Sequence, residues 1–200
     1  DFEKSYYWLT NAANQGDSSS MFMLFMNYNL DYKESGNNAS EYKDKASFWF
    51  KKASEGSNRA LYNLALCFRD GEGVEQDYSE AIKIFKSLMD KNDASGICAL
   101  GVMYYEGKGV PIDYKEAVRL TKLAIKQGHN TSQRNLGEFY EYGRGVKQDN
   151  VKALMWYMIS LKNGWEESKE LIEKLVEKMS LSDLEKSEKL ANDYLAKQKN

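Results

Sequence analysis

The stretch from residue 100 to residue 117, LGVMYYEGKGVPIDYKEA, decides the fold because two other segments of the chain repeat its pattern. The segments that begin at Leu64 and Leu136 carry the same G-x-G-V turn, followed by an aspartate and then an alanine at the same spacing. The copies start 36 residues apart, and a period of this length is typical of stacked-repeat architectures. Because such folds mainly present surfaces to partners, the repeat favours binding over catalysis.

Each copy is predicted to form two helices joined by a glycine turn. Apolar and aromatic residues at spacings of three and four precede the turn and predict the first helix. The glycines accept the positive φ that ends a helix. Aspartates after the turn predict N-terminal capping boxes for the second helix. The predicted caps are Asp77 with Glu80, Asp113 with Glu116, and Asp149 with Lys152 in place of the glutamate.

Small side chains near the repeated leucines predict close helix packing. Four residues before each leucine stand Ser20, Ala60, Gly96 and Ser132, and one residue after it stand Phe25, Ala65, Gly101 and Gly137, with Phe25 as the exception. The equivalent large residues of the second helices are predicted to be core, because an aromatic at helical spacing is more often packing than a ligand cage. These are Trp8, Trp49, Ile84, Leu120 and Trp156.

The two ends and one insertion depart from the period. The extra residues of the early copy lie between Tyr28 and Ala46, which predicts either a longer first helix or an exposed loop.

Asp1 falls on the capping position, so the chain is expected to begin within a repeat of a longer protein or at a degenerate start. We predict about four repeats over residues 1–165, the first partial and the second irregular. Residues 166–200 are predicted to be C-terminal capping helices, the last starting at a Ser182–Glu185 capping box.

Composition narrows the function classes. The chain has 200 residues and a net charge of −2. It therefore lacks the overall positive charge that is typical of nucleic-acid-binding proteins. No apolar run approaches the roughly 20 residues that span a bilayer. A single proline agrees with a nearly all-helical chain. Cys67 and Cys98 are expected to be free thiols, with a bridge between repeats as the alternative.

No motif for a cofactor, metal or nucleophile stands out. His129 is the only histidine, and its place in a link between helices predicts a solvated side chain. There is no C-x-x-C, no P-loop and no G-x-S-x-G sequence. We therefore expect no cofactor and no metal, and an enzymatic function is the least favoured hypothesis.

The repeated residues resemble a known family, the SEL-one-like repeat (SLR) proteins, which are relatives of the tetratricopeptide repeats. The family pattern is A-x-x-x-L-G-x-x-Y-x-x-G-x-G-V-x-x-D-x-x-x-A-x-x-W, and the copies at Leu100 and Leu136 follow it most fully. The resemblance covers about residues 1–165. It implies an all-α, right-handed α-solenoid of stacked helix-turn-helix repeats that acts as an adaptor, scaffold or regulator. Some bacterial members of the family have a disulfide within each repeat. This chain differs from them, because Cys67 and Cys98 stand at different positions of their repeats.

The resemblance also implies where a partner would bind. In the related tetratricopeptide fold the first helix of each repeat lines the concave face, and steps of three and four place its residues on one stripe. Leu66, Val102 and Glu141 lie on the same stripe. For Leu66 and Val102 the alternative to a role in partner binding is packing in the core. The predicted partner-binding residues are Phe22, Met26, Tyr62, Arg69, Asp70, Tyr105, Glu106, Arg134, Glu138 and Tyr142.

The leading functional hypothesis is a non-catalytic interaction module that holds a protein or peptide in its concave groove. The stripe changes from apolar to acidic along the chain, which predicts a partner with an apolar end and a basic end. The alternative is a regulator or immunity-type inhibitor that blocks one enzyme or toxin, using the insertion at residues 29–45. Neither hypothesis involves nucleic acid or membrane insertion. The sequence leaves the oligomeric state and the localisation open.

Overall fold

The computed structural model describes residues 2–34, 39–55, 57–72 and 74–198, and the chain divides into two compact units. Unit 1 spans residues 1–91 and unit 2 spans residues 92–200. Unit 1 contains α1 (Phe2–Asn14), α2 (Ser18–Glu34), α3 (Ala39–Ser54), α4 (Asn58–Asp70) and α5 (Tyr78–Asp90). Unit 2 contains α6 (Ala94–Glu106), α7 (Tyr114–Lys126), α8 (Thr131–Tyr142), α9 (Asn150–Lys162), α10 (Ser168–Val176) and α11 (Leu181–Lys197).

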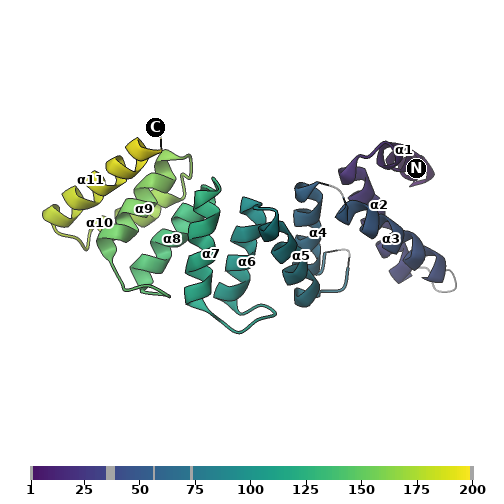
Figure 1. The fold of residues 1–200 in the computed structure, drawn as a ribbon, viewed down its shortest axis with the longest axis horizontal. Helices are drawn as coiled ribbons and strands as arrows, with labels where there is room; N and C mark the ends of the chain where they lie inside the picture. The colour runs from purple at the N-terminus through teal and green to yellow at the C-terminus, as the bar shows by residue number, and fades with distance from the viewer. Residues whose placement is uncertain (1, 35–38, 56, 73, 199–200) are drawn as a thin grey trace. The chain divides into compact units, whose positions relative to one another are not determined.

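The all-α class is confirmed. The described residues form eleven helices and no strand. Within the units α2 packs on α3, α4 on α5, α6 on α7 and α8 on α9, so each repeat is a helix pair (Figure 1). The insertion lengthens the helices: α2 has 17 residues, whereas α4 and α6 have 13. The domain boundary predicted at residue 165 remains a prediction.

The glycine turns have the predicted backbone conformation. Gly71, Gly107 and Gly143 end α4, α6 and α8 with φ values of 74°, 71° and 65°. Each glycine N–H donates to a carbonyl four residues earlier, as in a left-handed C-cap. The second glycine of the turn is also left-handed, with φ of 73° at Gly109 and 70° at Gly145. In the turns at Gly107 and Gly143 both glycines therefore adopt a conformation that favours glycine, whereas Gly73 lies outside the described residues.

Gly109→Val should destabilise the protein more than Lys108→Ala. A β-branched residue at the positive φ of Gly109 costs on the order of 1–2 kcal/mol. Lys108 has a partly exposed ion pair with Glu106 at 2.8 Å, and a pair of this kind contributes about 0.5 kcal/mol. Thermal unfolding followed by circular dichroism measures both variants, and equal melting temperatures would show that the turn does not need its glycine.

The aspartate caps are confirmed, but the capping boxes are only half formed. Asp77 accepts hydrogen bonds from the N–H groups of Ser79 and Glu80 at 2.9 and 3.0 Å. Asp113 does the same at its helix, and Asp149 caps α9 while pairing with Lys152 at 2.9 Å. The glutamates do not bond back to the aspartate N–H groups. Those groups donate instead to carbonyl oxygens of Phe68, Tyr104 and Tyr140 in the preceding helix.

The predicted capping box at Ser182 and Glu185 is wrong. Helix α11 begins two residues earlier, with Ser180 as its cap. The Ser180 hydroxyl accepts from the Asp183 N–H at 3.2 Å and donates to the Asp183 carboxylate at 2.8 Å. The same S-x-x-acid pattern occurs in two overlapping registers here, so the sequence alone did not distinguish them.

The repeated leucines form the core. Leu24, Leu64, Leu100 and Leu136 are all at most 1% exposed. In unit 2 the core continues through Ala117, Val118, Ile125 and Phe139 into a second cluster around Leu154, Tyr157 and Leu175. Trp8 contradicts its predicted core role because 68% of it is exposed. Trp49, Ile84 and Leu120 are buried, and Trp156 is half-buried against the core.

Both cysteines are free thiols on helices, as predicted. Burial raises the pKa of the Cys67 thiol to about 11 and also raises the pKa of Cys98. Because the thiolate is the reactive form, neither thiol should react readily with Ellman's reagent in the native protein at pH 8. Two equivalents should react once urea unfolds the chain. Fast native reaction would contradict the packing, and no reaction after unfolding would indicate a disulfide.

Candidate functional site

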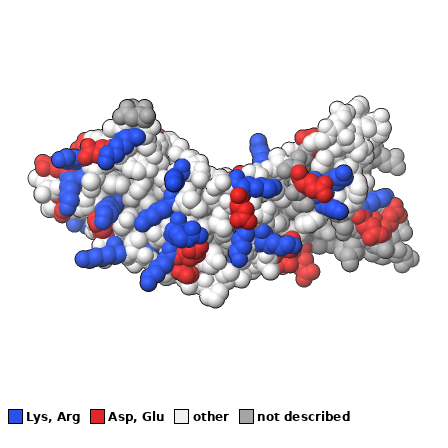
Figure 2. Space-filling model, viewed as in Figure 1, with Lys and Arg blue, Asp and Glu red and all other residues white. Residues whose placement is uncertain are grey.

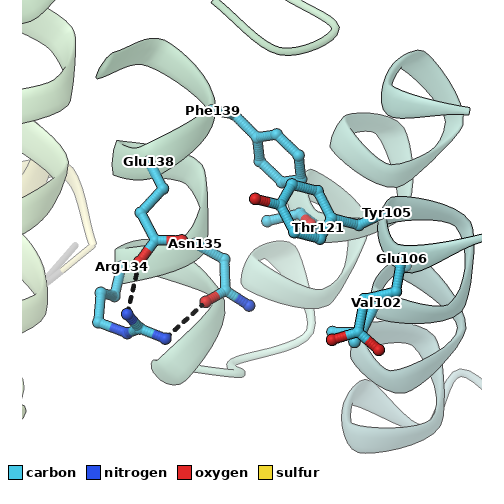
Figure 3. A pocket seen from close by; sticks show the side chains of 9 residues that line it. Val102, Tyr105, Glu106, Thr121, Arg134, Asn135, Glu138 and Phe139 are labelled. Carbon is cyan, nitrogen blue, oxygen red and sulfur yellow. Dashed lines mark hydrogen bonds and ion pairs between the residues drawn. The ribbon is translucent and has the colours of Figure 1, made fainter. Parts of the chain in front are cut away.

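A cavity of about 260 Å³ lies in unit 2 among α6, α7 and α8. Val102, Tyr105 and Glu106 line it from α6, and Thr121 lines it from α7. On the opposite side α8 contributes Arg134, Asn135, Glu138 and Phe139, which face the α6 side chains across the opening (Figure 3). Four of the ten predicted partner-binding residues therefore converge here: Tyr105, Glu106, Arg134 and Glu138.

The α8 wall carries an ion pair. Arg134 donates to the Glu138 carboxylate at 2.6 Å and makes a longer contact of 3.4 Å with the Asn135 side-chain oxygen (Figure 3). About a third of each charged side chain stays exposed, 32% for Arg134 and 30% for Glu138. Burial raises the pKa of Glu138, and Glu141 adds to this effect while Arg134 opposes it. The wall thus offers a partner both a guanidinium and a carboxylate.

Tyr105 forms the aromatic wall and is held in place from several sides. Its ring lies edge-on to Phe139 at 5.5 Å and near Tyr114 at 5.6 Å. Arg144, in the turn after α8, stacks over the Tyr105 ring at 5.3 Å and donates a hydrogen bond to the Tyr105 hydroxyl. A fixed aromatic side chain at the edge of a cavity suits an interface anchor because little rotamer freedom is lost on binding.

The other predicted residues of the stripe lie elsewhere. Tyr142 is 58% exposed and does not line the cavity, although Arg144 lies over its ring at 5.2 Å. Glu141 accepts a hydrogen bond from the buried Tyr157 hydroxyl at 2.7 Å. Val102, whose alternative was core packing, is half-buried and lines the cavity, and Leu66 is also half-buried.

Five predicted residues belong to unit 1. Tyr62 is half-buried, with its ring 6.0 Å from Phe85. Arg69 pairs with its neighbour Asp70 through two hydrogen bonds of 2.8 and 2.6 Å. Phe22 and Met26 on α2 are half-buried. These residues remain predicted partner-binding positions.

Sequence reasoning missed Thr121, Asn135, Phe139 and Arg144 at this site. Thr121, Asn135 and Phe139 lie outside the predicted stripe of the first helices. Arg144 lies in the glycine turn, where a basic residue is expected to be a solvent-exposed side chain. Gly101 also lines the cavity. A small residue after the repeated leucine indicates that two helices lie close together. It does not tell whether the space beside that residue is filled by side chains or left as a cavity.

His129 lies in the link between helices as predicted, but it is half-buried and not fully solvated. Its Nδ1 lies 2.8 Å from the Ser132 hydroxyl, and burial lowers the pKa of the imidazole. Among the described residues no group of three or more His, Cys, Asp or Glu side chains could hold a metal ion. No helix in the described ranges combines the length and apolar character needed to cross a bilayer.

Comparison with known proteins identifies the repeat. The Sel1 repeat model matches residues 1–17, 43–58, 58–93, 94–129 and 131–164, well over half of the chain. Proteins built from Sel1 repeats generally act as protein–protein interaction modules on a non-catalytic repeat scaffold. A search among curated proteins found no match.

Two solved structures are similar to this chain. One is a protective antigen of uropathogenic Escherichia coli that displays an SLR fold, at 27% identity and a TM-score of 0.72. That match covers 96% of this chain, and this chain spans 40% of the length of the antigen. The other is a Sel1 repeat protein of Oxalobacter formigenes, at 26% identity and a TM-score of 0.61, covering 85% of this chain and 71% of that one. With its five matched segments, the chain belongs to the Sel1 repeat family.

Proposed function

We propose that this protein is an interaction module whose unit 2 holds a protein or peptide partner at the cavity between α6 and α8. The observation that carries the proposal is the convergence of Tyr105, Glu106, Arg134 and Glu138 on one opening of about 260 Å³. Aromatic and arginine side chains dominate the energetics of protein interfaces. This cavity presents both types beside a half-buried carboxylate.

The lining suggests how a partner is recognised. Val102, Tyr105 and Phe139 provide an apolar surface, which suits one inserted aliphatic or aromatic side chain. Glu138 pairs with Arg134 and keeps 30% of its side chain exposed. Arg134 keeps 32% of its side chain exposed, so a carbonyl or carboxylate of the partner next to the inserted side chain can accept a hydrogen bond from its guanidinium, while a donor beside it meets Glu138.

Arg134→Ala should weaken binding of a captured partner by at least about tenfold while lowering the melting temperature by no more than about 4 °C. Truncation of an interface anchor typically costs about 2 kcal/mol, whereas a partly exposed ion pair contributes at most about 1 kcal/mol to stability. The partner is first captured from the native source and identified by mass spectrometry, and its affinity is then measured by calorimetry.

Lys189→Ala is the control, because Lys189 is exposed on α11 and does not line the cavity. Tyr105→Phe keeps the ring and removes the hydroxyl, so it tests recognition with less disturbance of packing than Tyr105→Ala. Equal binding by the wild-type protein, Arg134→Ala and Tyr105→Phe, all with unchanged melting temperatures, would contradict the proposal.

Exposed apolar side chains in unit 1 favour a second candidate, a regulator that binds and blocks one folded enzyme. Such side chains mark protein contacts when they cluster. In this role Phe48→Ser and Met23→Ser would abolish binding and inhibition, whereas Arg134→Ala would leave both intact. The exposed side chains lie on α1, α2 and α3 and are Tyr7 (60%), Trp8 (68%), Met23 (54%), Leu30 (45%) and Phe48 (52%).

A further inference from the structure

A second pocket lies on the other side of α8, where α7, α8, α9 and α11 meet within unit 2. Its volume is about 370 Å³, within the range of roughly 300–1,000 Å³ for ligand sites. It shares no lining residue with the cavity between α6 and α8. On α8 itself, Leu136 and Tyr140 line this pocket, whereas Arg134 and Glu138 line the other. These are different faces of one helix.

The pocket has an apolar floor and aromatic walls. Leu136 and Ile125, exposed by 1% and 8%, belong to the core and form the floor. Trp156 and Tyr194 form one wall, with ring centroids 4.9 Å apart in an edge-on arrangement. Tyr194 accepts a hydrogen bond from Gln198 at 2.9 Å, which fixes the phenol at the opening. This arrangement can bury one apolar side chain.

The rim of the pocket is cationic. Lys122 and Lys126 lie one turn apart on α7, are both exposed, and line the pocket. In the described part of the chain neither ammonium group pairs with a carboxylate, and no acidic residue lines the pocket. Figure 2 shows Lys and Arg side chains over α7, with acidic side chains beside some of them. Two unpaired cations above an apolar floor, on a chain of net charge −2, are complementary to an anionic ligand with an apolar body.

We propose that this pocket binds a short acidic peptide motif, in which one aromatic or aliphatic side chain enters between Trp156 and Ile125 while flanking carboxylates pair with Lys122 and Lys126. Lys122 and Lys126 are i,i+4 neighbours on one face of α7, so both ammonium groups are available on the same rim of the pocket. A nucleic acid gains its affinity from many phosphate contacts, which two lysines do not supply. A membrane surface would meet Lys122 and Lys126 but has no side chain to fill the pocket.

The proposal is tested by NMR titration of the full ¹⁵N-labelled chain with the peptide Ac-GDFDEG-NH2. The indole N–H signal of Trp156, identified by its loss in Trp156→Phe, should shift and saturate. Ac-GDADEG-NH2 lacks the anchor and Ac-GNFNQG-NH2 lacks the charge, so each should bind at least about fivefold more weakly. The double variant Lys122→Ala/Lys126→Ala should also bind about fivefold to tenfold more weakly, the loss expected for two exposed charge pairs.

The matched control is Lys115→Ala/Lys189→Ala, which removes the same total charge from α7 and α11 outside the pocket. It should bind Ac-GDFDEG-NH2 as the wild-type protein does. No saturable shift of the Trp156 signal, or equal weakening by both double variants, would overturn the proposal. A stronger shift with oligothymidylate or with phosphatidylserine vesicles would also overturn it and assign the pocket to nucleic acid or to membrane. Arg134→Ala should leave this titration unchanged, so its outcome is independent of the cavity between α6 and α8.

Discussion

Gly145→Ala should destabilise the protein by about 3 kcal/mol. A Cβ atom at this position would lie 2.2 Å from the Tyr114 carbonyl oxygen and 2.9 Å from the Lys115 nitrogen. These are backbone atoms at the start of α7, so they cannot move aside without shifting that helix. Gly145 also has φ of +70°, which costs a residue with a Cβ roughly 1–2 kcal/mol. Overpacking adds roughly 1–3 kcal/mol.

Gly164→Ala separates the two contributions. Gly164 has φ of +95°, and no atom lies within 4 Å of the position where its Cβ would be. Its substitution should therefore cost only the conformational part, roughly 1 kcal/mol. Urea unfolding followed by circular dichroism at 222 nm compares the two variants. Equal losses of stability would show that the turn between α8 and α9 does not pack closely on the start of α7.

Gly137→Ala should cost about 2–3 kcal/mol, although alanine favours a helix more than glycine by about 1 kcal/mol. Its Cβ would lie 2.5 and 2.6 Å from two ring carbons of Tyr157. Tyr157 is fully buried, and its hydroxyl donates to Glu141 at 2.7 Å. The ring therefore has no open space to enter, and the two helices of the repeat must separate.

Gly101→Ala is the control at the same position of the preceding repeat. There the added Cβ would lie 3.3 Å from the Leu120 Cβ and 3.6 Å from the Thr121 hydroxyl, so a small shift and the gain in helix propensity should nearly cancel. Thr121 holds the place of Tyr157 in that repeat. Tyr157→Thr should consequently relieve Gly137→Ala, with a coupling energy of about 2 kcal/mol. Additive effects of the two changes would contradict this packing.

The fold was predictable because local signals and the period agree. Leu64, Leu100 and Leu136 recur at a fixed step, and glycines and aspartates mark the helix ends between them, so each repeat supports the interpretation of the next. Where the period stops, this support is absent. Ser180 and Ser182 each stand three residues before an acidic residue. Because this segment is not repeated elsewhere in the chain, the sequence could not show which serine caps the helix.

Other features depended on contacts that no single helix encodes. The return bonds of Glu80 and Glu116 do not form, because the carbonyl oxygens of Phe68 and Tyr104 already accept the aspartate N–H groups. Trp8 follows the spacing of a core residue yet is exposed. At the candidate site the stripe identified Arg134 and Glu138, but Arg144 reaches Tyr105 from a turn 39 residues away.

The most direct test of the proposed function is site-specific photo-cross-linking to the captured partner. Benzoylphenylalanine replaces Val102 at the edge of the cavity, Phe48 on the exposed face of α3, or Lys189 on α11. We predict a partner cross-link from position 102 that Arg134→Ala suppresses, and none from position 189. A cross-link from position 48 or 189 with none from position 102 would contradict a partner site at this cavity.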